Sequence, residues 1–354
     1  MAAALELIHL LQTARKHAAS DVHVVVGLPP LFRVDGEVVT GKGESLSGAD
    51  LVRLVEACTS AEQRARLLQE RQLCFSTLFG VQDRARVTVY LRNGFPELAI
   101  RVAERVLRTR EELGLPAVLD ELVRRPHGLL LITGPTGSGK TTTFHYLVHR
   151  INEEQRKKLI TIEDPIEYVH LANRSLVVQQ EVGTDVLDFA SALKHVLRQD
   201  PDVIGVGELL GRETIHTALV AAETGHLVLG TLHTPDTVQV VQRVLGAFGE
   251  GSQAEVRQLL ANSLLAVVSQ QLLPRATGGG RVLCHEVLIG TPAVRHLIRE
   301  GEVHKLYSEI QAGRRHGMVT MDHSLLERYG KGDITYDTAV TMARFPEAIQ
   351  RRLG

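Results

Sequence analysis

The first third of the chain alternates short helical and strand-like patterns of apolar residues. The opening MAAALELIHLLQTARKH has the spacing of an amphipathic helix rather than of a signal peptide. ASDVHVVVGLPPLFRVDGEVV predicts two short strands around a turn at Gly27–Pro30. SGADLVRLVEACTSAEQRARLLQE predicts a helix capped by Ser47 or Asp50, and RARVTVYLR alternates as a strand does. We therefore expect residues 1–105 to form a small α+β domain.

The pattern changes after a polar stretch, and residues 106–118 are expected to form a linker with a short helical turn. From Leu119 onward, apolar segments of strand length, GLLLIT, KLITIED, VIGVGE and HLVLGTLHT, alternate with segments of helix length. This alternation predicts an α/β domain over residues 119–354, with a mainly parallel sheet and helices on both faces. Beyond residue 250 one long amphipathic helix is predicted from the spacing of Val256, Leu259, Leu260, Val267 and Val268.

The stretch LLLITGPTGSGKTTT joins a predicted strand to a predicted helix and fits the pattern Gly-x4-Gly-Lys-Thr. Its glycines let successive amide groups point at phosphate oxygens, and the start of the helix adds a positive field. Lys140 would reach the β- and γ-phosphates, and the Thr141 hydroxyl would coordinate Mg²⁺. The sequence therefore predicts a site for ATP and Mg²⁺, formed by Gly134, Thr136, Gly137, Ser138, Gly139, Lys140, Thr141 and Thr142.

Two of the predicted strands end in acidic residues. Glu163 and Asp164 end one strand, and Glu208 ends the next. In open α/β sheets such groups lie at the carboxyl ends of the strands, beside the phosphate-binding loop. Attack on the γ-phosphate needs a carboxylate that accepts a proton from water or orients it. Acids at strand ends are also common as solvated groups, so each of these carboxylates alone is ambiguous, but together they favour catalysis.

Two histidines flank the last of the four predicted strands, His226 before it and His233 at its end. Either could contact phosphate or couple the nucleotide to movement. The alternative for each is a purely structural hydrogen bond.

Composition narrows the class of protein without naming a function. At 354 residues the chain is long for one core, which favours two domains. Lys and Arg number 40 against 41 Asp and Glu, so the net charge does not indicate binding to nucleic acid. No apolar run approaches the ~20 residues of a membrane span. Scattered cysteines, Cys58, Cys74 and Cys284, argue against disulfides and zinc and favour the cytosol.

Four segments, GPTGSGKTTT, TIEDPIEYVH, AAETGHLVLGTLHT and GTPAVRHLIREG, follow one another in this order. They resemble the Walker A, Asp box, His box and AIRNLIRE-like elements of the secretion-type hexameric ATPases. Within them the chain is most similar to the PilT-type retraction motors of type IV pili. The resemblance covers essentially the whole chain. It implies a RecA-like P-loop ATPase domain preceded by a PAS-like domain.

The resemblance also implies a function: a homohexameric ring that hydrolyses Mg-ATP to power pilus retraction and twitching motility. Such a motor is expected in the cytoplasm, at the periphery of the inner-membrane pilus machinery. Its partners would be the pilus platform protein and a paralogous retraction ATPase. No nucleic acid is implied.

Individual roles follow from the same resemblance. Glu163 of the Asp box is implied to activate water, and Glu208 to be the acidic Walker B residue near Mg²⁺. His226 and His233 belong to the His box. In this family arginines of the N-terminal domain complete the site across subunits, and the candidates here are Arg84, Arg86 and Arg101.

The last of the four segments also predicts a helix from its own spacing. Thr291 can cap it, Pro292 suits its first position and Gly301 can end it. Val294, Leu297 and Ile298 share one face, and Arg295 and Arg299 are expected to point outward on another. In the family, this element is linked to retraction rather than to ATP turnover.

The chain departs from the family at three places. GELLG replaces the usual G-E-M-R-D, so Leu210 and Gly211 stand for Arg and Asp, with Arg212 one place further on. QQEV replaces Q-R-E-V, with Gln180 for Arg, and GAFGEGSQ lacks a usual proline. A lost arginine at an anionic site removes a bond of about 1.5–3 kcal/mol. A low-activity, ATP-binding accessory paralogue is therefore the first alternative, and a pilus assembly or type II secretion ATPase is the second.

Overall fold

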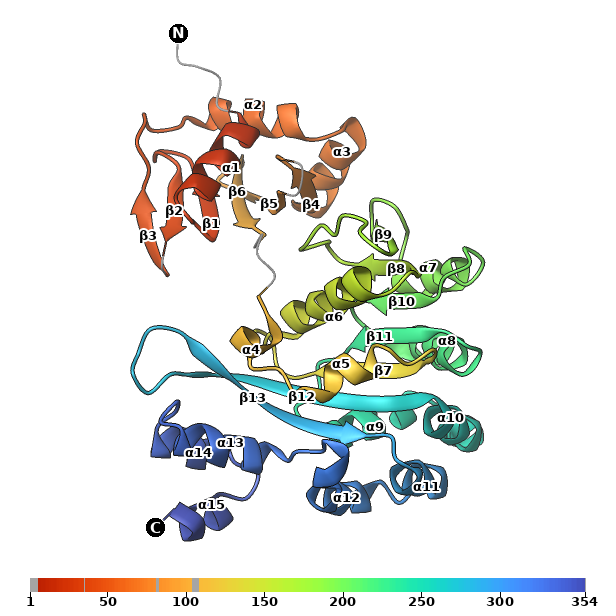
Figure 1. Cartoon of the computed structure of the whole chain (residues 1–354). Helices are drawn as coiled ribbons and strands as arrows, with labels where there is room; N and C mark the ends of the chain where they lie inside the picture. The colour runs from red at the N-terminus through yellow and green to blue at the C-terminus, as the bar shows by residue number, and fades with distance from the viewer. Residues whose placement is uncertain (1–5, 35, 81–82, 104–107, 354) are drawn as a thin grey trace. The chain divides into compact units, whose positions relative to one another are not determined.

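The structure is a computed structural model that describes residues 6–34, 36–80, 83–103 and 108–353. The chain divides into two compact units. The first comprises Met1–Val106 with Pro165–Leu171, and the second comprises Leu107–Asp164 with Ala172–Gly354. Each unit is described by itself below (Figure 1).

The first unit is built on an antiparallel sheet with the strand order β3-β2-β1-β6-β5-β4. Its core lies between this sheet and three helices, which contribute buried residues such as Leu11, Leu51 and Leu54. The elements are α1 (Leu7–Lys16), β1 (Asp21–Val24), β2 (Leu31–Val34), β3 (Glu37–Thr40), α2 (Gly48–Cys58), α3 (Ala61–Glu70), β4 (Gln72–Leu78), β5 (Arg84–Arg92) and β6 (Phe95–Val102).

Two details of this unit differ from the sequence prediction. The turn at Gly27–Pro30 is followed by β2 and then by a third strand, β3, so the segment forms three strands rather than two. The predicted long helix is broken into α2 and α3. Ser60 has an extended backbone, and its hydroxyl accepts a hydrogen bond from the Gln63 amide in a capping box. Because Ser60 offers a new helix start, α2 ends at Cys58.

The second unit contains a sheet with the strand order β13-β12-β7-β11-β10-β8-β9. Strands β12 to β9 in this order run parallel, and only β13 is antiparallel. The strands are β7 (Gly128–Thr133), β8 (Lys158–Glu163), β9 (Leu176–Glu181), β10 (Val203–Val206), β11 (Leu227–Thr231), β12 (Leu264–Pro274) and β13 (Arg281–Ile289).

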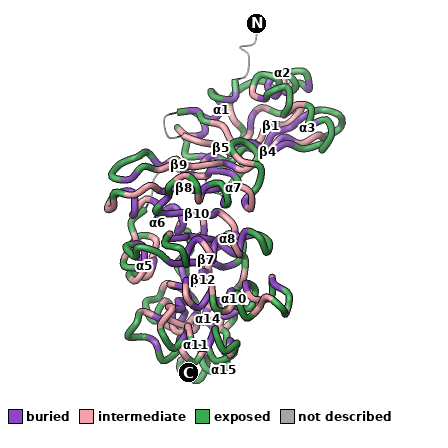
Figure 2. Tube along the Cα trace, turned by 90° about the vertical axis from the view of Figure 1, so that its right-hand side faces the viewer, coloured by how far each residue is buried: buried purple, intermediate pink, exposed green. Residues whose placement is uncertain are grey.

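Helices cover both faces of this sheet, as the alternating pattern predicts. Leu129 and Leu131 of β7 face one core, whereas Leu130 and Ile132 face the other. The first core is covered by α7 (Phe189–Val196), α8 (Gly211–Glu223), α9 (Thr237–Gly246), α10 (Glu250–Ser263) and α11 (Pro292–Glu300). The second is covered by α5 (Val118–Leu122) and α6 (Lys140–Glu154). Figure 2 shows the buried strands between partly exposed helices.

The prediction of one long helix beyond residue 250 is wrong. Helix α10 ends at Ser263, and the chain continues directly as β12, which pairs with β7 and β13. Most of β12 is buried, and its first five residues, Leu264–Val268, form an uninterrupted apolar run. A continuous apolar run has the same pattern in a buried strand and in a buried helix, and only pairing with β7 distinguishes them.

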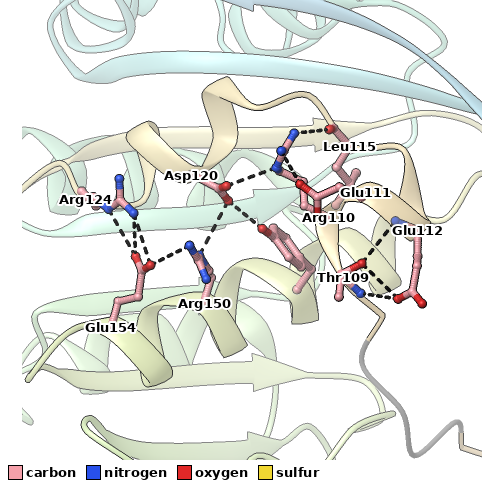
Figure 3. Close-up of polar contacts among 10 residues, drawn as sticks. Thr109, Arg110, Glu111, Glu112, Leu115, Asp120, Arg124, Arg150 and Glu154 are labelled. Carbon is pink, nitrogen blue, oxygen red and sulfur yellow. Dashed lines mark hydrogen bonds and ion pairs between the residues drawn. The ribbon is translucent and has the colours of Figure 1, made fainter.

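The segment expected to be a linker is connected to α5 and, through α5, to α6 by polar contacts (Figure 3). Asp120 accepts a hydrogen bond from the Tyr146 hydroxyl at 2.6 Å. It also forms an ion pair with Arg110, whose Nε lies 3.2 Å from a carboxylate oxygen. Arg150 pairs with Glu154 at 2.7 Å on the same helix. The linker helix itself, α4 (Arg110–Leu113), begins in a capping box between Thr109 and Glu112. These contacts connect α4 to α5 and α5 to α6 through Asp120.

The C-terminal part packs helices against β12 and β13. The elements are η1 (Val303–Lys305), α12 (Leu306–Ala312), η2 (Gly313–His316), α13 (Met321–Gly330), α14 (Tyr336–Thr341) and α15 (Pro346–Leu353). Among the described residues, no helix is both long enough and apolar enough to cross a membrane.

A histidine on β13 should make the stability of the protein depend on pH. Burial lowers the pKa of His285 to about 4. Its Nδ1 is buried and has no hydrogen-bond partner among the described residues, although the residue keeps partial exposure. Since the unfolded chain has the ordinary pKa of about 6.5, it binds more protons below that pH. Stability is therefore full above pH 6.5 and falls towards pH 4, by about 1–2 kcal/mol at pH 5.

Urea denaturation of the wild type and His285→Phe at pH 7 and pH 5 would check this expectation. The variant should lose less free energy of unfolding on acidification than the wild type. Equal losses in the two proteins would contradict it.

Candidate functional site

The loop Gly134–Gly139 connects the carboxyl end of β7 to the start of α6. Gly139 caps α6 in the left-handed conformation, with φ 91°, and Gly137 has φ 78°. Lys140 begins the helix and is 8% exposed. Its Nζ donates to the carbonyl oxygens of Gly134 at 2.8 Å and Pro135 at 3.0 Å. The predicted strand, loop and helix are therefore confirmed, and the lysine bends back over the loop.

Strand β12 supports this loop from one side, which the sequence analysis missed because it predicted a helix there. A Cβ placed on Gly134 would lie 2.3 Å from the carbonyl oxygen of Gln270. The Gln270 side chain donates from Nε2 to the Thr143 hydroxyl on α6 at 2.7 Å. Beside this strand, Arg281 at the start of β13 donates to the carbonyl oxygen of Gly137 at 3.3 Å. The loop is thus held against β12 and β13.

Several features of this loop suit a bound anion and a divalent cation. The Ser138 hydroxyl is buried, at 2% residue exposure, and lacks a hydrogen-bond partner among the described residues. Thr136 and Gly137 are exposed, and Thr141 and Thr142 are partly exposed in the first turn of α6. Within the described ranges, no group of three His, Cys, Asp or Glu side chains could hold a metal. Hydroxyl and carboxylate oxygens beside a phosphate site fit Mg²⁺, which is usually bound through few protein ligands.

Glu208 lies two residues beyond β10, at the same edge of the sheet as the loop. Its Oε1 is 3.3 Å from Nε2 of His233, which lies two residues beyond β11. The Glu208 side chain is 31% exposed and that of His233 is 45% exposed. Burial lowers the pKa of Lys140, and the negative charge of Glu208 partly offsets that effect. Glu208, His233 and Lys140 therefore form one electrostatic group.

The chain after β11 is pinned so that His233 keeps this place. The Thr234 amide donates to the Thr133 hydroxyl at 2.9 Å, and the Leu232 amide donates to the carbonyl oxygen of Ile132 at 2.9 Å. Thr133 is the last residue of β7, so the histidine loop is attached directly to the strand that precedes the phosphate loop.

Glu163 ends β8 and is only 3% exposed. Its Oε1 accepts hydrogen bonds from the Thr161 hydroxyl at 2.6 Å and from Nε2 of Gln179 at 2.9 Å. Its Oε2 is 3.4 Å from Nε2 of His145 on α6. Both oxygens are therefore engaged. Of the two predicted catalytic carboxylates, Glu208 is the more accessible.

His226 lies away from this group. It precedes β11, and its carbonyl oxygen accepts from the amide of Gly128, the first residue of β7. Its Nδ1 lies 3.0 Å from the carbonyl oxygen of Ala221, at the end of α8. Because β7 and β11 are parallel, His226 is separated from the phosphate loop by the length of a strand. The structure places His233 beside Glu208 at the edge of the sheet that carries the loop, and His226 at the opposite end of β11.

The three candidate arginines lie in the sheet of the first unit. Arg84 and Arg86 are two residues apart on β5, and Arg101 of β6 pairs directly with Arg86. Residues two apart and residues directly opposite point to the same face of a sheet, so all three share one face. Arg86 and Arg101 are exposed, whereas Arg84 is partly buried and donates to the Ser76 hydroxyl. The structure thus gathers the arginines that the sequence could not rank.

Helix α11 begins and ends as predicted, with Thr291 as N-cap, Pro292 in the first turn and Gly301 in the left-handed conformation after it. Val294, Leu297 and Ile298 are buried. Arg299 is exposed.

The prediction that Arg295 points outward is wrong. Arg295 donates to the carbonyl oxygens of Gly290 at 2.8 Å, Asn262 at 2.7 Å and Leu264 at 3.0 Å. Asn262 lies in the last turn of α10, where helix carbonyl groups have no partner within the helix, and a guanidinium group satisfies them. Burial also lowers the pKa of Arg295. Sequence spacing placed this residue on a surface, because the neighbouring helix end is not visible in the pattern.

The structure also shows where the residues lie that differ from the family pattern. Leu210 is 53% exposed, and Gly211 begins α8 with φ 75° and open space around it. Arg212 lies over the ring of Phe248, 5.4 Å from its centroid. Gln180 on β9 has a buried Oε1 without a hydrogen-bond partner in the described part of the chain.

Comparison with known proteins gives a consistent result. A family model described as "Type II/IV secretion system protein" matches residues 4–323. The chain is 41% identical to the "Type IV pilus retractation ATPase PilT" of Pseudomonas aeruginosa, over 97% of this chain and 99% of that protein. It is 36% identical to the "Type IV pilus ATPase PilU" of the same organism, over 96% and 89%. The structure titled "Crystal Structure of the Pilus Retraction Motor PilT and Bound ADP" matches with a TM-score of 0.90 and 39% identity, covering 98% and 99%.

Proposed function

Because the chain belongs to the type II/IV secretion system protein family, we propose that it is a Mg-ATP-hydrolysing hexameric motor that powers the retraction of type IV pili. The observation that carries this proposal is the match over nearly the whole chain to a pilus retraction motor with bound ADP. The phosphate loop and Glu208 at one edge of the sheet, with His233 beside Glu208, support it, since hydrolysis needs a phosphate-binding loop and a carboxylate together. The fold and the resemblance to PilT-type ATPases expected from the sequence motifs are confirmed.

Each group in the site has a distinct task in this proposal. The amides of Gly137–Lys140 and the start of α6 bind the β-phosphate, and Lys140 leaves its carbonyl partners to contact the β- and γ-phosphates. Thr141 and Glu208 would hold Mg²⁺, which would neutralise charge on the phosphates. Glu208 and Glu163 are the two carboxylates available to orient the attacking water and accept its proton.

The arginines of the first unit complete the site in the ring. Arg84, Arg86 and Arg101 present positive charge on one face of their sheet. Supplied by a neighbouring subunit, such an arginine stabilises charge on the γ-phosphate only when the ring closes. Hydrolysis is thereby coupled to movement of the two units. The motor acts in the cytoplasm, at the inner-membrane pilus machinery, with the platform protein as its partner.

A second candidate function is an accessory subunit that binds ATP, hydrolyses little and assembles with a more active motor. It is favoured by the replacement of an arginine by Leu210 and of another by Gln180, whose Oε1 is buried without a partner among the described residues. The similarity to the PilU protein over most of both chains is compatible with it.

Steady-state turnover of Mg-ATP, measured against the concentration of the full chain, tests the proposal. Turnover per subunit should rise as rings assemble, because the arginines come from a neighbouring subunit. Glu208→Ala serves as the inactive reference, and ADP binding confirms that each preparation is folded. Assembled rings that bind ATP but turn it over no faster than Glu208→Ala would contradict the motor and favour the accessory subunit.

A further inference from the structure

A buried polar cluster links the phosphate-loop helix to Glu163. His145 is 1% exposed and follows Phe144 in the second turn of α6, among residues that are otherwise apolar. Its Nε2 lies 3.4 Å from Oε2 of Glu163. A buried imidazole and a buried carboxylate are costly unless each has a polar partner. The contact between them is therefore a specific feature of this core rather than an incidental surface pair.

The other oxygen of Glu163 is fixed from the sheet. Thr161 lies two residues before Glu163 on β8, and Gln179 is directly opposite Thr161 on β9, so all three share one face. Their donors meet Oε1 at 2.6 and 2.9 Å. The face is the one covered by α6, because Leu159 on the same side packs in the core with α6. The carboxylate is thus held between a sheet and a helix.

The packing around this cluster leaves little freedom. Gly205 on β10 is paired with Thr161, and a Cβ there would lie 2.7 Å from Phe144 and 2.9 Å from the Thr161 methyl. The His145 ring contacts the Phe144 ring edge-on, at 5.3 Å between centroids. Close packing on this side restricts the rotation of both Thr161 and His145.

From these contacts we infer that His145 is a positioning residue for Glu163. Thr161 and Gln179 hold Oε1 by hydrogen bonds, and Nε2 of His145 lies 3.4 Å from Oε2, so contacts on both oxygens restrict the plane of the carboxylate. Because His145 and Lys140 belong to the same helix, the lysine that binds phosphate and the histidine that orients the carboxylate move together. This role rests on the proposed function, in which Glu163 orients or activates water.

The same helix provides a matched control. His149 lies one turn after His145, and its Nε2 is also 3.4 Å from a glutamate oxygen, that of Glu153. The side chains of this second pair are 37% and 44% exposed, against 1% and 4% for His145 and Glu163. Exposed pairs contribute little, since water and salt screen them. Only the buried histidine should affect catalysis.

The test compares kcat and KM for ATP, together with ADP binding, in full-length wild type, His145→Ala, His145→Gln and His149→Ala. We expect His145→Ala to lower kcat by about 10- to 100-fold, because small misplacements of a reacting group have effects of this size. The ADP dissociation constant should change by less than about 2-fold, since Lys140 and the loop amides remain in place. His145→Gln keeps an N–H donor and should recover part of the lost kcat. His149→Ala should match the wild type.

Thr161→Val removes one donor to Oε1 with little change in volume and gives a second variant if His145→Ala does not fold. It should lower kcat with the same selectivity. If the wild type turns over ATP and kcat is unchanged in His145→Ala, the positioning role is overturned while the proposed motor function stands. Unchanged kcat in both His145→Gln and Thr161→Val has the same meaning. Equal losses of kcat and of ADP binding would also overturn it, because they indicate a purely structural role. Absent wild-type turnover in assembled rings would overturn the proposed motor function, and the positioning role with it.

Discussion

Replacing Glu208 by glutamine is expected to lower the ATP turnover of assembled rings by about 10²–10⁴-fold. Glu208 is the accessible carboxylate of the site, 3.3 Å from His233 and close enough to Lys140 to influence its pKa. Glutamine keeps the size of the side chain but accepts a proton far less readily and binds a cation weakly. Binding of ADP should be retained, because the loop amides and Lys140 are unchanged. Steady-state turnover and fluorescence titration with a labelled ADP measure the two quantities.

Glu213→Gln is the matched control for this prediction. Glu213 lies five positions along the chain in α8, is exposed and pairs with Lys194 on α7. Its replacement should leave turnover unchanged. A Glu208→Gln variant that retains at least about a third of wild-type turnover would show that another carboxylate performs the chemistry.

Replacing Gly134 by alanine should weaken ADP binding by about 10- to 100-fold, because the phosphate loop would be displaced. Gly134 has φ 140°, which L side chains rarely adopt, and its Cβ would lie 2.3 Å from the carbonyl oxygen of Gln270 and 2.6 Å from the Ser138 hydroxyl. The backbone of β12 cannot move without losing hydrogen bonds, since this strand pairs with β7 on one side and β13 on the other. The loop must therefore move away from the strand, and its amides move with it.

Gly137→Ala separates backbone strain from the close approach. Gly137 also has a positive φ, 78°, but nothing lies within 4 Å of its Cβ position. Left-handed backbone costs an L residue about 1–2 kcal/mol, so this variant should lose at most about 30-fold in ADP affinity. Isothermal titration of both variants gives the comparison. If Gly137→Ala binds ADP as weakly as Gly134→Ala, contact with β12 is not the reason that a glycine is required.

Much of the site could be predicted from the sequence because its signals are local. The phosphate loop is one uninterrupted segment, and its strand, glycines, lysine and helix follow one another within a few residues. The cap and the apolar face of α11 are local for the same reason. The strands β7, β8, β10 and β11 were predicted because their apolar runs are short and are separated by helices.

The errors arose where a residue's partner is distant in the sequence. Arg295 is predicted to point outward because its position in α11 gives no information about the carbonyl groups of Asn262 and Leu264, which accept its hydrogen bonds. The first half of β12 is predicted as helix because Leu264–Val268 is an uninterrupted apolar run, and its pairing with β7 spans more than a hundred residues. Nothing in the sequence pattern indicates a role for His145. A histidine within an apolar helix has no sequence signal that identifies Glu163 as its partner.

The sequence by itself determined that this protein carries a nucleotide-binding motif, that it is built on an α/β sheet, and that it resembles the pilus retraction ATPases. These properties depend on short segments whose geometry is set by neighbouring residues. Only the tertiary structure decided which acidic residue is accessible, which histidine lies at the edge of the sheet that carries the phosphate loop, and what holds Glu163 in place. Those answers depend on burial and on contacts between separate strands and helices, and distance along the chain does not specify either of them.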